Sequence, residues 1–348
     1  MSTVHCPHAT AKSRKANERP LTARLSLALI AALLFTSAAQ LTARADGVTA
    51  TIAVGANPIS AAISPDGSLV YVSNNNSGSI SVINAFTNTV VNTIFTPSLP
   101  AGLALTPDGT ELWVALGGAN SVAVYDTSTL TLHAGFPQNP IPVGSGPQNI
   151  AFKAGGGQAF VTNYFSNTVS VIKVGSGLVT NTVSVGLNPL GIAVAFNSAT
   201  GVNTVFVANY GSNTTTYFNP SSLVPNTIGV GAQPYGVAAT PDGAEVYVTN
   251  SGSNNMTRID VASATVISTI ATGTRPEGVV VRNSSAGFRI HVANNGSNTV
   301  MKIKPSGVIL ATVAVGANPV GIAALPSGNL LYVTNAGSNT VSVIDVNL

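Results

Sequence analysis

The stretch LYVTNAGSNTVSVID, residues 331–345, contains the unit from which this chain is built. Its tetrad YVTN occurs in seven versions: valine is always second, Ser, Ala or Thr is third, and asparagine is fourth in all but one. The first residue is aromatic in six versions and is His291 in the other. The tetrads are YVSN (71–74), WVAL (113–116), FVTN (160–163), FVAN (206–209), YVTN (247–250), HVAN (291–294) and YVTN (332–335). Their last residues lie 41 to 47 positions apart, which indicates a repeat architecture.

Each repeat predicts four β-strands. A run of small residues, a Pro-Asp-Gly turn and the tetrad strand come first, as in GVAATPDGAEVYVTN (236–250). Glycine supplies the positive φ that such a turn requires. A Gly-Ser-Asn turn and an alternating strand such as TVSVID (340–345) follow, and the last strand ends in Val-Gly before a proline. Alternation with period two and many β-branched residues indicate an all-β fold.

Seven units of four strands predict a seven-bladed β-propeller of antiparallel blades over residues 46–348, numbered here by the order of their tetrads. The small residues of each first strand fit the crowding of seven strands around one axis. The segment VTATIAVG (48–55) has the form of a fourth strand, yet it precedes the first complete unit. The last unit ends after its third strand. We therefore expect the N-terminal strand to complete the last blade and close the ring.

The first 45 residues have the pattern of a secretory signal peptide. An apolar core, LSLALIAALLF (25–35), is followed by small residues and ends at ARA (43–45). The basic residues before the core are Lys12, Arg14, Lys15, Arg19 and Arg24. The core is shorter than the about 20 apolar residues of a membrane-spanning helix. We expect cleavage after Ala45 and a soluble protein exported to the periplasm or the extracellular space; an uncleaved N-terminal anchor is the alternative.

Removal of this segment changes the charge of the protein. Eight of the 14 Lys and Arg residues and ten of the 11 acids follow Ala45, so the mature net charge is −2. A nucleic-acid partner is therefore disfavoured, because such proteins need a basic surface that neutralises phosphates. Cys6 precedes the cleavage site, so no disulfide is expected in the mature chain.

Strand order defines two faces of the ring. The bottom carries the first-to-second and third-to-fourth turns, and the top carries the second-to-third turns and the loops between blades. Eight acids fall on the bottom: Asp66, Asp108, Glu111, Asp126, Asp242, Glu245, Asp260 and Asp345. Their even spacing predicts solvated turn residues, whereas a metal site needs converging carboxylates. Blades three and six differ and carry bottom cations: Lys153, Lys173, Arg282, Arg289, Lys302 and Lys304.

Motifs for catalysis are missing from the mature sequence. Only His133, expected in an exposed loop, and His291, expected in the core, remain, and they lie in different blades. They do not form a zinc or iron site. No Gly-x-Ser-x-Gly nucleophile motif or phosphate-binding glycine loop occurs. The sequence thus predicts no metal, no cofactor and no catalytic residue, and the repeated tetrad asparagine is expected to cap the turn that follows it.

The top face differs from the bottom, because uncharged Asn, Gln, Ser and Gly residues dominate its loops. We expect its only charges to be Arg275 and Glu277, apart from the N-terminal Asp46. Aromatic residues join them in blades three to five: Tyr164, Phe165, Tyr210 and Tyr235. These six residues, from Tyr164 to Glu277, form the candidate ligand site. Its ligand would be neutral and polar, a glycan or a peptide, stacked on the rings. Alternatively, the aromatics only cover loop backbone.

With its seven tetrads, the chain resembles the YVTN-family seven-bladed β-propeller repeat proteins throughout residues 46–348. That family includes surface-layer and periplasmic proteins and has lactonase-like relatives. The seven near-regular blades and the absence of a ligand cluster favour an exported, monomeric, non-catalytic scaffold that binds a glycan, a peptide or a cell-surface component. Two alternatives stay open: a lactonase-like propeller hydrolase, and a periplasmic DNA-binding propeller, which the negative mature charge disfavours.

Overall fold

The computed structural model of this protein describes residues 1–3, 5 and 46–346. The predicted signal segment lies almost entirely outside these residues, so the cleavage site stays a prediction. Among the described residues, no helix is long and apolar enough to cross a membrane.

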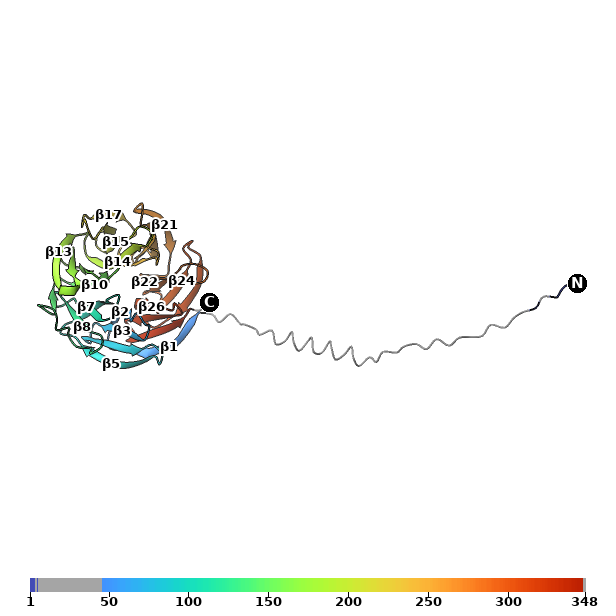
Figure 1. Ribbon diagram of the computed structural model, residues 1–348, viewed down its shortest axis with the longest axis horizontal. Coiled ribbons are helices and arrows are strands. Elements are labelled where there is room, and N and C mark those ends of the chain that lie inside the picture. The colour runs from blue at the N-terminus through green and yellow to red at the C-terminus, as the bar shows by residue number, and fades with distance from the viewer. Residues whose placement is uncertain (4, 6–45, 347–348) are drawn as a thin grey trace. The chain divides into compact units, whose positions relative to one another are not determined.

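Seven four-stranded antiparallel sheets form the structure, and Figure 1 shows them arranged around a central axis. In blades one to three, the strands are β2 (Pro58–Ile63), β3 (Leu69–Asn74), β4 (Ser79–Asn84), β5 (Thr89–Phe95), β6 (Pro100–Leu105), β7 (Glu111–Leu116), β8 (Ser121–Asp126), β9 (Ile141–Pro142), β10 (Pro147–Phe152), β11 (Gln158–Asn163), β12 (Thr168–Lys173) and β13 (Leu178–Ser184). A short 3-10 turn, η1 (Val174–Ser176), precedes β13. The predicted all-β propeller is confirmed.

The remaining blades repeat the same order. Their strands are β14 (Pro189–Asn197), β15 (Val202–Asn209), β16 (Thr214–Phe218), β17 (Asn226–Gly229), β18 (Pro234–Ala239), β19 (Glu245–Asn250), β20 (Asn255–Asp260), β21 (Thr265–Ala271), β22 (Pro276–Arg282), β23 (Arg289–Asn294), β24 (Thr299–Ile303), β25 (Ile309–Ala314), β26 (Pro319–Ala324), β27 (Leu330–Asn335) and β28 (Thr340–Asp345). The last blade also contains β1 (Gly47–Ala53), which the chain supplies from its other end.

The N-terminal strand closes the ring, as the sequence predicts. β1 pairs antiparallel with β28, from Gly47 opposite Asp345 to Ala53 opposite Thr340. Figure 1 shows blue β1 beside the red strands of the last blade. Because one blade contains both ends of the propeller, neither β28 nor the ring is left with an open edge at this point.

The hydrophobic core consists of interfaces between neighbouring blades. One cluster joins Val70 and Val72 of blade one with Tyr332, Val341 and Val343 of blade seven, all buried. The aromatic first residue of the tetrad thus packs between two sheets, where burial of such a side chain contributes about 1.5–3 kcal/mol. The repeated pattern therefore specifies both the blade and the surface that attaches it to the next blade.

Glycines near the axis allow the first strands to approach one another closely. A Cβ atom added at Gly236 would lie 2.3 Å from the carbonyl oxygen of Glu277, and one at Gly191 would lie 2.3 Å from that of Tyr235. Such contacts are too short for any side chain, so the small residues predicted for the axis are a steric requirement. Ser60 and Asn149 occupy the corresponding positions in blades one and three.

The tetrad asparagine connects strands and does not cap the turn backbone as expected. In blade five, the buried Asn250 Nδ2 donates to Asn255 Oδ1 at 2.8 Å and to Thr257 Oγ1 at 2.9 Å. Gly231, which lies two residues after the preceding blade's last strand, packs against it: an added Cβ would lie 2.7 Å from Asn250 Cγ. Blade two, the one blade with leucine (Leu116) in the tetrad, also lacks this glycine and has Pro97 instead. Asparagine and glycine are therefore replaced together.

Candidate functional site

The six predicted ligand residues line one pocket on the top face, with a volume of about 300 Å³. The pocket is lined by Gln148, Tyr164, Phe165, Leu190, Tyr210, Tyr235, Ser251, Arg275 and Glu277. We call it the top-face pocket. Most of its residues come from two repeated positions, the one after the tetrad asparagine and the one after the proline that begins each blade. Loops that are far apart in sequence therefore converge because the blades share one register.

The aromatic wall of the pocket is fixed by backbone contacts. The Tyr164 N–H donates to the Gly146 carbonyl at 2.9 Å, and the Tyr210 N–H donates to the Asn188 carbonyl at 3.1 Å. The rings of Tyr164 and Phe165 meet edge to face with centroids 5.0 Å apart. Phe165 is 69% exposed and lies against Gly146, where an added Cβ would be 2.5 Å from the ring. A largely exposed aromatic ring held on glycine is suited to contact a ligand.

Glu277 is the buried acid of the site. Its carbonyl oxygen accepts a hydrogen bond from Thr249 Oγ1 at 2.6 Å, so the tetrad of blade five positions it. Its carboxylate lies 3.1 Å from Arg275 Nε, and the side chain is 4% exposed. Burial raises the pKa of Glu277 to about 7, although the charge and hydrogen bond of Arg275 oppose the rise. The carboxyl is thus poised to exchange a proton near neutral pH.

Arg275 has an unusual backbone conformation, with φ 52°. The same position before the blade proline has positive φ in five other blades, at Asn57, Gly146, Asn188, Gln233 and Asn318. Asparagine adopts this conformation more readily than arginine does. The Arg275 N–H donates to Asn254 Oδ1 at 2.8 Å, which holds the residue in place. Its side chain is 62% exposed, so the guanidinium reaches over the pocket from a fixed backbone.

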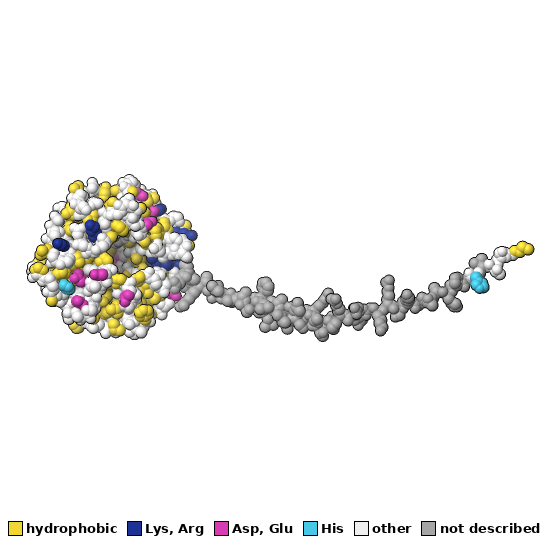
Figure 2. Space-filling model, viewed as in Figure 1, with side chains coloured by type: hydrophobic (Ala, Val, Ile, Leu, Met, Phe, Trp, Pro, Cys, Tyr) yellow, Lys and Arg dark blue, Asp and Glu magenta, His cyan; other side chains and the backbone are white. Residues whose placement is uncertain are grey.

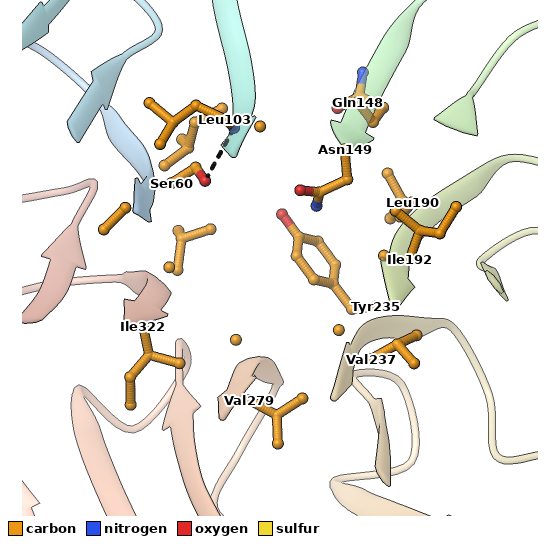
Figure 3. Close-up of a pocket in the computed structure, with 18 residues that line it drawn as sticks. Ser60, Leu103, Gln148, Asn149, Leu190, Ile192, Tyr235, Val237, Val279 and Ile322 are labelled. Carbon is orange, nitrogen blue, oxygen red and sulfur yellow. Dashed lines mark hydrogen bonds between the residues drawn. The ribbon is translucent and has the colours of Figure 1, made fainter. Parts of the chain in front are cut away.

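Tyr235 separates the top-face pocket from the axial cavity, which has a volume of about 200 Å³. Figure 3 shows its ring extending across the axis with the hydroxyl pointing toward Asn149. Burial raises the pKa of Tyr235 above its ordinary value, and the charge of Glu277 adds to this effect. Tyr235 and Glu277 also line an adjoining pocket of about 370 Å³, where Asn295 and Asn318 supply carboxamides.

The bottom acids differ in role. Asp66, for example, is an exposed turn residue that accepts hydrogen bonds from Ser64 and Ser68, and these lower its pKa to about 2. This confirms the prediction for the turn aspartates. Figure 2 shows charged side chains scattered over the face in view and not gathered in one patch. For Glu111 and Glu245 the prediction of solvated turn residues is wrong.

Both glutamates are partly buried and hold aromatic side chains. Glu111 accepts from Trp113 Nε1 at 2.8 Å. Glu245 accepts from the Tyr247 hydroxyl at 2.7 Å and pairs with Arg258. The contacts with Trp113 and Tyr247 join residues two apart on one strand, whereas the pair with Arg258 crosses from β19 to β20. Within the described residues, no group of three or more His, Cys, Asp or Glu side chains could hold a metal ion.

The histidines serve structural roles. His291 is a buried core residue, as predicted, and its Nε2 accepts from Arg282 Nε at 3.0 Å. His133 is only partly exposed: its Nε2 lies 3.5 Å from Glu111 Oε1, and its ring packs against Phe136. The loop that carries it covers the edge of β8 in place of a full outer strand. In that loop, Asn139 accepts from the Val124 N–H at 3.0 Å and donates to its carbonyl at 2.7 Å.

Three residues of the top-face pocket escaped prediction: Gln148, Leu190 and Ser251. Each occupies a repeated position already known from another blade. Gln148 and Leu190 correspond to Tyr235 and Glu277, and Ser251 corresponds to Tyr210. An alignment of the seven repeats at these two positions would therefore have identified them.

Comparison with known proteins agrees with this architecture. The family described as "Lactonase, 7-bladed beta-propeller" matches residues 102–306, more than half of the chain. Curated proteins give no sequence match. The Kuenenia stuttgartiensis hydrazine synthase structure is 21% identical, with a TM-score of 0.73, over 83% of this chain and 96% of that chain. A streptogramin B lyase structure is 16% identical, with a TM-score of 0.68, over 84% and 94%. At these identities the two structures show the fold alone.

Proposed function

Because this chain belongs to the family of seven-bladed β-propeller lactonases, we propose that it uses the top-face pocket to bind a small, polar ligand that has a flat or ring-shaped face. The observation that carries this proposal is the convergence of all six candidate residues on one pocket. Pockets at which several loops converge are the usual sites of ligand binding.

The chemistry of the walls narrows the class of ligand. Tyr164, Phe165 and Tyr210 offer aromatic surfaces on one side, and Gln148 and Ser251 offer uncharged hydrogen-bonding groups. Arg275 and Glu277 already pair with each other, so the site carries little net charge. A glycan or a peptide segment meets these conditions, since sugar faces and peptide planes stack on aromatic rings and exchange hydrogen bonds with amides and hydroxyls.

The cellular setting follows from the sequence. We infer that the protein is exported to the periplasm or beyond the cell, acts there as a monomeric YVTN-type scaffold, and takes its ligand from the cell surface. The N-terminal signal pattern and the repeated tetrads support this assignment. The low number of basic residues in the mature chain argues against nucleic acid as the partner.

A binding screen tests the proposal. Purified protein is applied to arrays of glycans and short peptides, and the double variant Tyr164→Ala, Tyr210→Ala is compared with Phe86→Ala. Phe86 is 80% exposed and lies on the bottom side of blade one, so it serves as a matched surface aromatic. The double variant should lose binding and keep its thermal stability, whereas the control should keep both. Equal binding by all three proteins would refute the assignment of the site.

A second function is favoured by one specific observation, the raised pKa of Glu277 to about 7 beside Arg275. A carboxyl group with that pKa serves as a general base or acid near neutral pH. Opening of a lactone ring would use Glu277 to activate water and Arg275 to stabilise the developing oxyanion. Proton release from a panel of lactones, measured at constant pH, tests this function. Activity that survives in Glu277→Gln at the level of the control Asp126→Asn would exclude it.

A further inference from the structure

The bottom of blade six contains buried cations at positions where blade five contains a balanced ion pair. In blade five, Arg258 Nε lies 2.9 Å from Glu245 Oε2. The corresponding residues of blade six are Lys302 and Arg289, which are 4% and 8% exposed. Where the neighbouring blade has one acid and one base, blade six therefore has two bases.

A third cation joins them. Arg282 stands directly opposite Arg289 in the pairing of β22 with β23. Like charges opposite each other in a sheet are destabilising. Arg282 donates to His291 Nε2 at 3.0 Å and to the Val346 carbonyl at 2.8 Å, and Arg289 Nη1 donates to three loop carbonyls. Within residues 46–346, neither arginine pairs with a carboxylate.

Asp46 is an acid beside these cations, and it already forms an ion pair with Lys302. Asp46 lies 3.1 Å from Lys302 Nζ, and both side chains are buried. This position corrects the expectation that Asp46 belongs to the top face. β1 runs from bottom to top, so the residue before it lies at the bottom, next to the end of β28. Asp46 therefore forms its ion pair with Lys302 and with neither arginine, although its charge also acts on Arg282.

A cavity of about 230 Å³ lies beside the two arginines. Its wall includes Arg282, Ser284, Arg289, Ser327 and Val346. An atom added at Gly328, on the opposite wall, would lie 3.7 Å from Arg282 Nη1, which places this end of the guanidinium at the cavity. We call this cavity the blade-six pocket.

The repeat itself shows what the blade-six pocket lacks. Ser327 occupies the turn position at which blades one, two and five carry Asp66, Asp108 and Asp242. Blade seven thus has a hydroxyl where those three blades have a carboxylate, and this is the turn that faces the two arginines. Arg282 and Arg289 therefore lie beside a turn position that lacks the carboxylate found in blades one, two and five.

We propose that the blade-six pocket binds a small oxyanion, such as phosphate, sulfate or the carboxylate of a small acid, between Arg282 and Arg289. Guanidinium groups bind such anions through paired hydrogen bonds, and the anion offsets the repulsion between the two arginines. This site lies on the face opposite the top-face pocket and does not depend on the proposed function. The pocket lies between blade six and blade seven, which Arg282 already joins through its hydrogen bond to the Val346 carbonyl.

Isothermal titration of the purified protein with phosphate, sulfate and acetate, against a chloride background, tests the proposal. Saturable binding at one site per chain is expected, together with a rise in melting temperature. Arg282→Gln should weaken binding on the order of 10- to 100-fold, the effect of losing a charged hydrogen-bond partner. Ser327→Asp should abolish it by placing the carboxylate of the other turns in the cavity, and it should raise the melting temperature without any added anion.

Lys173→Gln is the matched control, because Lys173 is an exposed cation on the bottom of blade three. It should leave binding unchanged. If the wild-type protein binds none of the anions, or if Lys173→Gln weakens binding as much as Arg282→Gln does, the site does not exist. Should Arg282→Gln fail to fold, unaltered binding in Ser327→Asp would refute the proposal equally well.

Discussion

The packing of tetrad asparagine on glycine makes a quantitative prediction about how the blades hold together. Gly231→Ala would place a Cβ atom 2.7 Å from Asn250 Cγ, in a region where Asn250 has no exposed surface. Overpacking of this kind costs about 1–3 kcal/mol. Replacement of glycine by alanine also restricts the unfolded chain, which offsets about 0.4–1 kcal/mol. We therefore expect Gly231→Ala to destabilise the protein by about 1–2 kcal/mol.

Gly229 provides the control within the same segment of chain. A Cβ atom added there meets nothing within 4 Å, so Gly229→Ala should be neutral or slightly stabilising. Urea unfolding, followed by circular dichroism and by the fluorescence of Trp113, would measure both variants. A lower midpoint for Gly231→Ala at an unchanged slope is the expected result. If the two variants unfold at the same midpoint, the asparagine does not require glycine, and their joint replacement in blade two has another cause.

Three further predictions concern the site, the closure and the N-terminus. Burial raises the pKa of Glu277 from 4.5 to about 7, so its contribution to stability is complete below pH 4.5 and is lost as the pH rises to about 7. The free energy of unfolding should fall by about 3 kcal/mol over this pH range. Glu277→Gln should remove this part of the pH profile of unfolding. Deletion of residues 48–54 should expose β28 as an open edge and cause aggregation, measurable by light scattering; a monomer of unchanged melting temperature would contradict the closure by β1. N-terminal sequencing of exported protein should begin at Asp46, and recovery of intact residues 25–35 in membranes would contradict cleavage.

The fold could be predicted from the sequence because every repeat has the same pattern of apolar and turn residues and therefore forms the same strands. Each tetrad carries the same alternation, so the register of one blade predicts that of all seven, and the unmatched segment at residues 48–55 identifies the closing strand. The same logic brought the top-face aromatics together, since Tyr164 and Tyr210 occupy one repeated position. Side-chain partners across strands were not accessible in this way. Whether Glu245 meets solvent or Arg258 depends on the neighbouring strand, which periodicity alone does not describe.

The two proposed sites have a common origin in departures from the repeat. A perfectly regular ring would present seven identical sectors, and nothing in it would favour one place for an asymmetric ligand. After the blade proline stand, in order, Ile59, Ala101, Gln148, Leu190, Tyr235, Glu277 and Val320. The polar members belong to blades three, five and six, and the top-face pocket forms where they meet the aromatics that follow the tetrads. The blade-six pocket arises in the same way, from arginines in one blade facing a turn that has lost its aspartate in the next. The regular positions hold the ring together, and the irregular positions give each of the two proposed sites a set of side chains that no other blade repeats.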